Sequence, residues 1–258
     1  MPNAWKMYKR LVAIETMRIF PSNVRGRPRK LKFGDAFDCI LDVVRTGMQW
    51  RRLRPEHCSY ITVFKTMYKW ASAGVFRTAY IRLLELYSRR RRPKYYCIDS
   101  SYVKNVYGRD CTGRNPTDRG RRASKLSTIV DDLGIPHTFH AAPGNTSDQR
   151  LLEPLLSQML VPLVPSAEMF ADKGYDSARN RAHCREYGLR DRIFKRRTIN
   201  GPRTHAKRGV IERFFSWHDK YRRLLVRYEQ GIGIYLEMTY LAAGNLLANR
   251  EIFRSGTD

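Results

Sequence analysis

Three acidic residues stand in local settings where a carboxylate could bind a metal ion. Asp99 ends the strand-like run 95–98, Asp172 ends the short apolar run 169–171, and Glu212 lies near the start of an amphipathic helix. Mg²⁺ prefers carboxylate oxygens and keeps several waters, so two aspartates and a glutamate suffice to hold a pair of ions. Such a pair can activate a water or a 3′-hydroxyl and stabilise the leaving oxygen of a phosphodiester.

Each of the three residues has a simpler interpretation when it is taken alone. An aspartate after a strand is often a turn residue, and Asp176 could cap a helix that follows Asp172. A glutamate in the first turn of a helix often complements the helix dipole. The combination is more specific, because neighbouring strands would bring Asp99 and Asp172 together and the helix of Glu212 could pack across them. We therefore interpret these residues as a catalytic, metal-binding triad.

The charge of the chain indicates a polyanionic partner. The 258 residues include 49 Lys and Arg against 24 Asp and Glu, for a formal net charge of +25. Such an excess attracts DNA or RNA. Because 42% of the residues are hydrophobic, the chain can form a core and is not a disordered polycation. A structural RNA-binding protein is an alternative from charge alone, but it leaves the triad unexplained.

The cysteines and the hydropathy pattern exclude several other classes. The five cysteines are widely spaced and include no CxxC pair, which fits a reducing compartment without structural zinc. No secretory apolar region and no run of eighteen apolar residues occurs, so we expect no membrane partner.

The N-terminal part predicts a small helical domain. Apolar residues recur at helical spacing in 35–47, 59–73 and 79–87, with Gly47 as a terminator and Ser59 as a cap. Three short helices suggest a helix-turn-helix module, in which the helix at 59–73 would read DNA through Lys65 and Lys69. Any small helical bundle would give a similar pattern, so this alternative stays open.

A basic segment at 26–30 precedes these helices. Its residues Arg27 and Arg29 could enter the minor groove as a flexible arm. A solvated linker is an equally good interpretation of the same composition.

The pattern changes after the basic run 88–94, which we take as a domain boundary. We expect a helical DNA-binding domain at 1–92 and an α/β domain with an RNase H-like mixed sheet, flanked by helices, at 93–258. The order of strands and helices supports this fold class. The predicted strands are 95–99, 102–107, 127–131, 137–141, 168–171 and 192–194, and the predicted helices are 148–160, 178–187, 207–223 and 233–250.

Basic residues accompany the third acidic residue. Arg208 precedes Glu212 by one helical turn, and Lys220, Arg222 and Arg223 follow it. These side chains could bind the phosphates of a DNA end or of a target. Salt bridges on a solvated face are the alternative.

The chain resembles the IS5-type DDE transposases of the IS4/IS5 superfamily, which move bacterial insertion sequences. The resemblance covers about Gly26 to Arg250 and is most specific around Glu212. It is carried in the N-terminal part by 26–28, 44–51 and 63–76, and in the catalytic part by 98–101, 131–136, 143–148, 171–176, 210–217, 221–224 and 227–229.

This resemblance implies an activity, a cofactor and partners. Asp99, Asp172 and Glu212 would bind Mg²⁺, with Mn²⁺ as a possible substitute. The enzyme would bind the terminal inverted repeats of its element, cleave a strand at each end, and join the ends to target DNA. A homo-oligomer is implied because two ends must be joined, and a bacterial host would imply a nucleoid-associated protein in the cytoplasm. The chain departs from the family at His205, where a tyrosine is expected, and in the loop 108–122.

Two other functions remain open at this point. A stand-alone nuclease of the same fold would cleave DNA without joining it. A catalytically silent DNA-binding protein derived from a transposase would bind DNA without cleaving it, although such a protein has no reason to keep three carboxylates.

Overall fold

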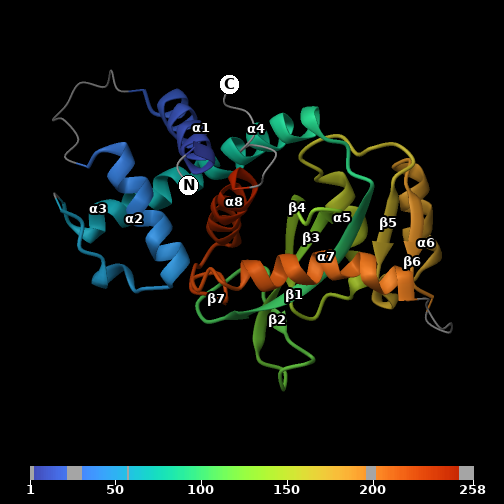
Figure 1. Cartoon of the computed structure of the whole chain (residues 1–258). Coiled ribbons are helices and arrows are strands. Elements are labelled where there is room, and N and C mark those ends of the chain that lie inside the picture. Colours follow the sequence, from blue (N-terminus) through green and yellow to red (C-terminus); the bar gives the residue numbers. More distant parts are fainter. Residues whose placement is uncertain (1–2, 22–30, 57, 196–201, 250–258) are drawn as a thin grey trace. The chain divides into compact units, whose positions relative to one another are not determined.

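The computed structural model describes residues 3–21, 31–56, 58–195 and 202–249 (Figure 1). The chain divides into two compact units. A helical unit comprises Met1–Tyr87, Asp219–Leu225 and Gly233–Asp258, and a catalytic unit comprises Ser88–His218 and Val226–Ile232. These units are not the contiguous segments 1–92 and 93–258, because the last helix of the chain packs with the N-terminal helices.

In its described residues, the helical unit contains five α-helices and a 3-10 turn, η1 (Trp50–Arg52). The helices are α1 (Asn3–Ile19), α2 (Phe33–Thr46), α3 (Tyr60–Ser72), α4 (Val75–Arg90) and α8 (Ile232–Ala248). Two of the predicted helix-end signals are confirmed. The Ser59 side chain accepts a hydrogen bond from the N–H of Ile61 at the start of α3, and Gly47 ends α2 with a φ of 70°.

The helix α1 was not predicted, and its buried face explains why. Glu15 and Thr16 are buried beside Tyr8 and Val12, so the inward face lacks a purely apolar pattern. The Glu15 carboxylate forms ion pairs with Arg18 and, from α4, with Arg82.

The catalytic unit is built on a seven-stranded sheet. The sheet is mixed, as the sequence predicts, but the short strands β2 and β7 were not predicted. The strands β1, β3 and β4 pair antiparallel, and β5 and β6 continue the sheet parallel to β1. Along the sheet the order is β2-β3-β1-β5-β6, with β4 beside β3 and β7 beside β1. The bounds are β1 (Tyr95–Asn105), β2 (Gly113–Arg114), β3 (Arg122–Asp131), β4 (Pro136–Pro143), β5 (Glu168–Ala171), β6 (Arg190–Ile193) and β7 (Val226–Arg227).

Helices cover both faces of this sheet (Figure 1). On one face, α5 (Leu152–Ser157) and α6 (Ala178–Glu186) join a core that includes Ile98 and Met169 of the strands. On the other face lies α7 (Pro202–His218), whose Phe214 ring is 6.0 Å from the ring of Phe139 in β4. Since side chains alternate across a strand, Cys97 and Asp99 share the face that α7 covers.

Four predicted elements, two strands and two helices, differ from the structure. The strands expected at 95–99 and 102–107 form one strand, and the helix expected at 148–160 is a 3-10 turn, η2 (Asp148–Arg150), followed by the short α5. The helix expected at 207–223 ends at His218, so Lys220, Arg222 and Arg223 follow it rather than extend it. None of the helices in the described ranges is both long and apolar enough to span a bilayer.

Candidate active site

The two aspartates are aligned by the parallel pairing of β1 and β5. Cys97 of β1 is in register with Phe170 of the adjacent strand β5. Asp99 and Asp172 each follow two residues later, so they lie next to each other. Asp99 accepts a hydrogen bond from the N–H of Ser100 at 2.8 Å. Asp172 caps the 3-10 turn η3 (Lys173–Tyr175) by accepting a hydrogen bond from the N–H of Lys173 at 2.7 Å. Local backbone contacts therefore fix both carboxylates at the same edge of the sheet.

A single guanidinium lies between the two carboxylates. The Nη2 atom of Arg208 is 3.4 Å from Asp99 Oδ2, and its Nη1 atom is 3.4 Å from Asp172 Oδ1. The Arg208 side chain is only 11% exposed and lies over the ring of Phe194. The predicted pair of aspartates thus converges on one cationic group, which α7 supplies.

Glu212 lies on α7 one turn beyond Arg208. Its neighbours Val210, Ile211 and Phe214 are buried against the sheet, whereas Glu212 itself is exposed. Within the described ranges, no three Asp, Glu, His or Cys side chains lie close enough to hold one metal ion. The structure therefore brings Asp99 and Asp172 together but leaves the Glu212 carboxylate apart from them.

The electrostatic setting of Asp99 favours a cation. Burial raises the pKa of Asp99 above its ordinary value, and the negative charges of Asp172 and Asp148 raise it further. The Ser100 N–H and the Arg208 guanidinium act in the opposite direction. A positive charge between these carboxylates relieves their repulsion, so the donor set suits a divalent cation.

Sequence reasoning missed Asp148, which also belongs to this site. Its Oδ1 atom accepts hydrogen bonds from Ser100 Oγ at 2.9 Å and from Lys125 Nζ at 2.6 Å. A Cβ atom at Gly174 would lie 2.6 Å from Asp148 Oδ2, so only glycine fits there. The sequence does show an acidic residue at the end of the run 143–148, but this run was interpreted only as a connecting turn.

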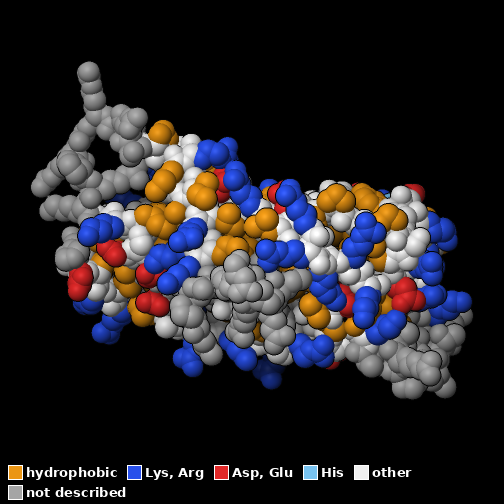
Figure 2. Space-filling view, turned by 45° about the horizontal axis from the view of Figure 1, so that its top comes forward, with side chains coloured by type: hydrophobic (Ala, Val, Ile, Leu, Met, Phe, Trp, Pro, Cys, Tyr) orange, Lys and Arg blue, Asp and Glu red, His pale blue; other side chains and the backbone are white. Residues whose placement is uncertain are grey.

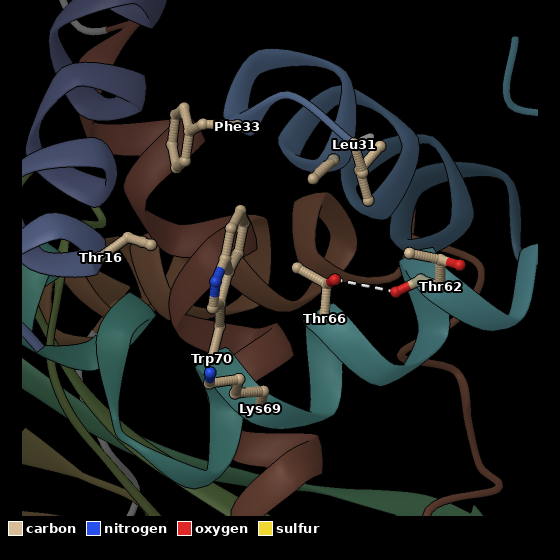
Figure 3. A pocket seen from close by; sticks show the side chains of 8 residues that line it. Thr16, Leu31, Phe33, Thr62, Thr66, Lys69 and Trp70 are labelled. Atoms are coloured by element: carbon tan, nitrogen blue, oxygen red, sulfur yellow. Dashed lines mark hydrogen bonds between the residues drawn. The ribbon is translucent and has the colours of Figure 1, made fainter. Parts of the chain in front are cut away.

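The predicted DNA-reading helix carries an apolar pocket on one face. Lys69 lines a cavity of about 340 Å³ together with Phe33 and Trp70, and its Nζ atom is 4.2 Å from the ring centroid of Phe20. Figure 3 shows these side chains around the cavity, with Thr66 bonded to the carbonyl of Thr62 one turn earlier. Lys65 is exposed on the same helix. Arg27 and Arg29 lie outside the described residues.

The three basic residues that follow α7 belong to the helical unit. The N–H groups of Arg222 and Arg223 donate to the carbonyls of Arg45 and Val44 at the end of α2. Lys220 is exposed in the turn before them. The prediction of one helix over 207–223 was wrong, because α7 ends at His218, so these three residues do not lie on the helix of Glu212.

Comparison with known proteins places the chain in a family. Residues 90–246, more than half of the chain, match the family model described as "Transposase DDE domain". Residues 4–80 match "Putative transposase of IS4/5 family". The chain belongs to the DDE transposases of the IS4/IS5 type. The predicted family is therefore confirmed, and with it an enzyme that cleaves DNA and transfers strands with the help of divalent metal ions.

Two relatives agree with this assignment. The transposase is 36% identical over 157 residues to "Putative transposase for insertion sequence element IS402" of Burkholderia cepacia, covering 58% of this chain and 71% of that protein. It is 34% identical over 109 residues to "Transposase for insertion sequence element IS1106" of Neisseria meningitidis serogroup B, covering 38% of this chain and 36% of that protein.

The fold of the transposase resembles that of a chain in a "piggyBac transposase synaptic complex with hairpin DNA". The TM-score is 0.55 at 10% identity, and the match covers 99% of this chain and 73% of the other. At this identity the likeness concerns the fold alone, and it supports the predicted RNase H-like α/β class.

Proposed function

We propose that Asp99, Asp172 and Glu212 are the metal-binding triad of this transposase and that Mg²⁺ is its ion, with Mn²⁺ as a substitute. The observation that carries the proposal is the convergence of Asp99 and Asp172 on the guanidinium of Arg208. Glu212 completes the set because residues four apart share one side of a helix. When bound, the metal activates the attacking oxygen and stabilises the leaving oxygen.

The protein side chains have separate tasks in this scheme. Asp99 and Asp172 are held by backbone N–H groups, so they form a fixed pair of ligands. Arg208 exchanges its contact with the carboxylates for a DNA phosphate, which guanidinium groups bind well. Ser100 of β1 and Lys125 of β3 both donate to Asp148, so these three residues tie the two strands to the turn η2 beside Asp99.

DNA recognition is divided between a helical domain, which we place at 1–92 together with the later segments that join the helical unit, and the catalytic domain, which occupies the rest of 93–258. The helical domain binds the terminal inverted repeats through Lys65 and Lys69, with Arg27 and Arg29 as a basic arm. Arg208, Lys220, Arg222 and Arg223 bind the phosphates of the donor ends or of the target DNA. Lys and Arg side chains spread widely over the face seen in Figure 2, which supports contact with a large polyanion.

The transposase acts as a homo-oligomer, because two element ends must be held together before they are joined to target DNA. In a bacterial host such a DNA-bound assembly would associate with the nucleoid. Both statements follow from the reaction rather than from a contact between chains.

The formation of joined DNA products tests this function against its rivals. The purified chain would be incubated with a labelled duplex that ends in the terminal repeat, a target plasmid, and either Mg²⁺ or Mn²⁺. We expect metal-dependent nicking followed by labelled joined products. Nicking without joining would support a stand-alone nuclease, and tight binding without nicking would support a catalytically silent DNA-binding protein.

A further inference from the structure

A strongly basic hairpin projects from the sheet edge of the catalytic unit. This segment, here called the arginine hairpin, comprises residues 104–122 and links β1 to β3 through β2. It contains six basic and two acidic residues. Figure 1 shows the β2 end of this segment extending away from the sheet. All the basic residues are exposed: Lys104, Arg109, Arg114, Arg119, Arg121 and Arg122.

The base of the arginine hairpin is locked by a buried arginine. Arg227 of β7 is fully buried and donates hydrogen bonds to the Asp110 carbonyl at 2.7 Å and to Ser124 Oγ at 2.9 Å. It also pairs with the Asp110 carboxylate, which accepts from the N–H of Ile232 as well. A Cβ atom at Gly108 would lie 2.6 Å from the guanidinium carbon, so the chain closes tightly around it. Asp110 is thereby neutralised within the fold and does not offset the exposed charge.

The tip of the arginine hairpin is equally well ordered. The Asn115 side chain accepts hydrogen bonds from the N–H and the hydroxyl of Thr117 at 2.9 and 2.8 Å. The backbone carbonyl of Asn115 accepts a hydrogen bond from the N–H of Gly120. Arg119 and Gly120 adopt positive φ values of 50° and 70°. A backbone fixed in this way presents its arginines at set positions, which lowers the entropy that binding would cost.

The exposed charges are not neutralised within the hairpin. In the part of the chain that the structure describes, Arg114 and Arg119 form no ion pair, and Arg121 has only an exposed contact of 3.7 Å with Asp118. Beside the base, the rings of Tyr107 and Tyr228 lie 6.2 Å apart and are 63% and 41% exposed. Exposed arginines together with exposed aromatic rings are typical of nucleic-acid-binding surfaces.

We propose that the arginine hairpin binds the phosphates of duplex DNA beside the catalytic centre. Lys104 lies five residues along β1 from Asp99, or roughly 17 Å at the rise of a strand, so one duplex could reach both. The contact is to the backbone and carries no sequence preference. The inference rests on the proposed DNA-joining function and adds a surface to it.

A charge-matched pair of variants of the full chain tests the proposal. The first carries Arg114→Ser, Arg119→Asn and Arg121→Ser, with Asn chosen because it tolerates a positive φ. The control carries Arg179→Ser, Arg185→Ser and Arg190→Ser, three exposed arginines of α6 and β6 at the opposite edge of the sheet. Both lose three positive charges, so a general effect of net charge would appear equally in both. Fluorescence anisotropy with a terminal-repeat duplex and an unrelated duplex would be measured across a salt series.

We expect the hairpin variant to bind both duplexes roughly tenfold more weakly than wild type, with the slope of log K against log salt reduced by about one per lost arginine. The control should keep the wild-type slope, and thermal melts should confirm that both variants fold. Equal slopes for the hairpin variant and the control would overturn the proposal while leaving the proposed function intact. A wild type that binds neither duplex would overturn both.

Discussion

The Ser100 hydroxyl donates a hydrogen bond of 2.9 Å to the carboxylate of Asp148, and Ser100 directly follows Asp99 in β1. The same carboxylate oxygen accepts from Lys125 of β3, while its partner oxygen faces Gly174 in the turn after Asp172. Asp148 therefore touches the chain next to both candidate metal ligands. We therefore expect Asp148 to act by positioning these two carboxylates.

The substitution Asp148→Asn should slow catalysis without unfolding the enzyme. It removes the negative charge that pairs with Lys125, so the strand beside Asp99 and the turn after Asp172 lose their shared anchor. We expect the single-turnover rate of strand nicking to fall roughly 10- to 100-fold, with DNA affinity unchanged. The control Glu153→Gln alters an exposed carboxylate on the neighbouring α5 and should keep the wild-type rate. A wild-type rate for Asp148→Asn would exclude this role.

Replacing Arg208 should make the folded protein more dependent on divalent metal. The Arg208 guanidinium contacts both Asp99 and Asp172, so its removal leaves the repulsion between the two carboxylates unrelieved until a metal ion binds. We expect Arg208→Gln to gain a larger rise in melting temperature from Mg²⁺ than wild type does. The control Arg192→Gln breaks an exposed ion pair with Glu168 at the β6 edge and should respond like wild type. Equal shifts for all three proteins would argue against a metal site between the aspartates.

Glu237 should make the stability of the transposase fall as the pH rises. This carboxylate of α8 accepts from the N–H groups of Phe76 and Arg77 at the start of α4, and burial raises its pKa from 4.5 to about 7. The folded protein therefore keeps a proton that the unfolded chain loses. The resulting stability is fully present below about pH 4.5 and is lost as the pH rises through about 7.

The substitution Glu237→Gln removes this titration and keeps an oxygen for the two N–H groups. Between about pH 4 and about pH 8, we expect wild type to lose on the order of 3 kcal/mol more unfolding free energy than the variant does. Urea denaturation at several pH values measures the difference. Glu85→Gln, an exposed change on α4, should retain the wild-type dependence. Parallel profiles for wild type and Glu237→Gln would show that this group is not responsible.

Two glycines of α8 should respond to alanine with opposite signs. A Cβ atom at Gly244 would overlap the buried ring of Tyr8 from α1, whereas a Cβ at Gly233 would meet no atom within 4 Å. Gly244→Ala should lower the unfolding free energy by about 2 kcal/mol or more, because overpacking outweighs the gain in helix propensity. Gly233→Ala should raise it by up to about 1 kcal/mol. Thermal or urea unfolding compares the two, and a stabilised Gly244→Ala would contradict the packing of α1 on α8.

The sequence predicts those parts of this fold that local patterns determine. Cys97 and Ile98 belong to a strongly apolar run, and the run at 168–171 is short and buried, so both strands that carry the aspartates were found. Their proximity followed from the mixed, RNase H-like sheet that the order of strands and helices predicts. The cap at Ser59 and the terminator at Gly47 depend on neighbouring backbone groups, and both were predicted correctly.

Features that depend on distant contacts were not predictable in this way. The place of Asp148 depends on Lys125 and Ser100, which are 23 and 48 residues away. The packing of α8 with α1 depends on Tyr8, whose hydroxyl bonds to the carbonyl of Tyr240. The burial of Arg227 could not be predicted from a local pattern, because its partner Asp110 lies in a loop more than one hundred residues earlier.

The most direct test of the central claim is single-turnover cleavage of a terminal-repeat duplex with Mg²⁺ by wild type and by Asp99→Asn, Asp172→Asn and Glu212→Gln. These changes keep the size of each side chain and remove only its charge, and DNA binding would be measured on the same samples. We predict that each variant binds the duplex like wild type. Its cleavage rate should fall by a factor of at least about 100, because each substitution removes a ligand of the catalytic metal. Wild-type cleavage by any one of the three variants would contradict the assignment of that residue to the triad.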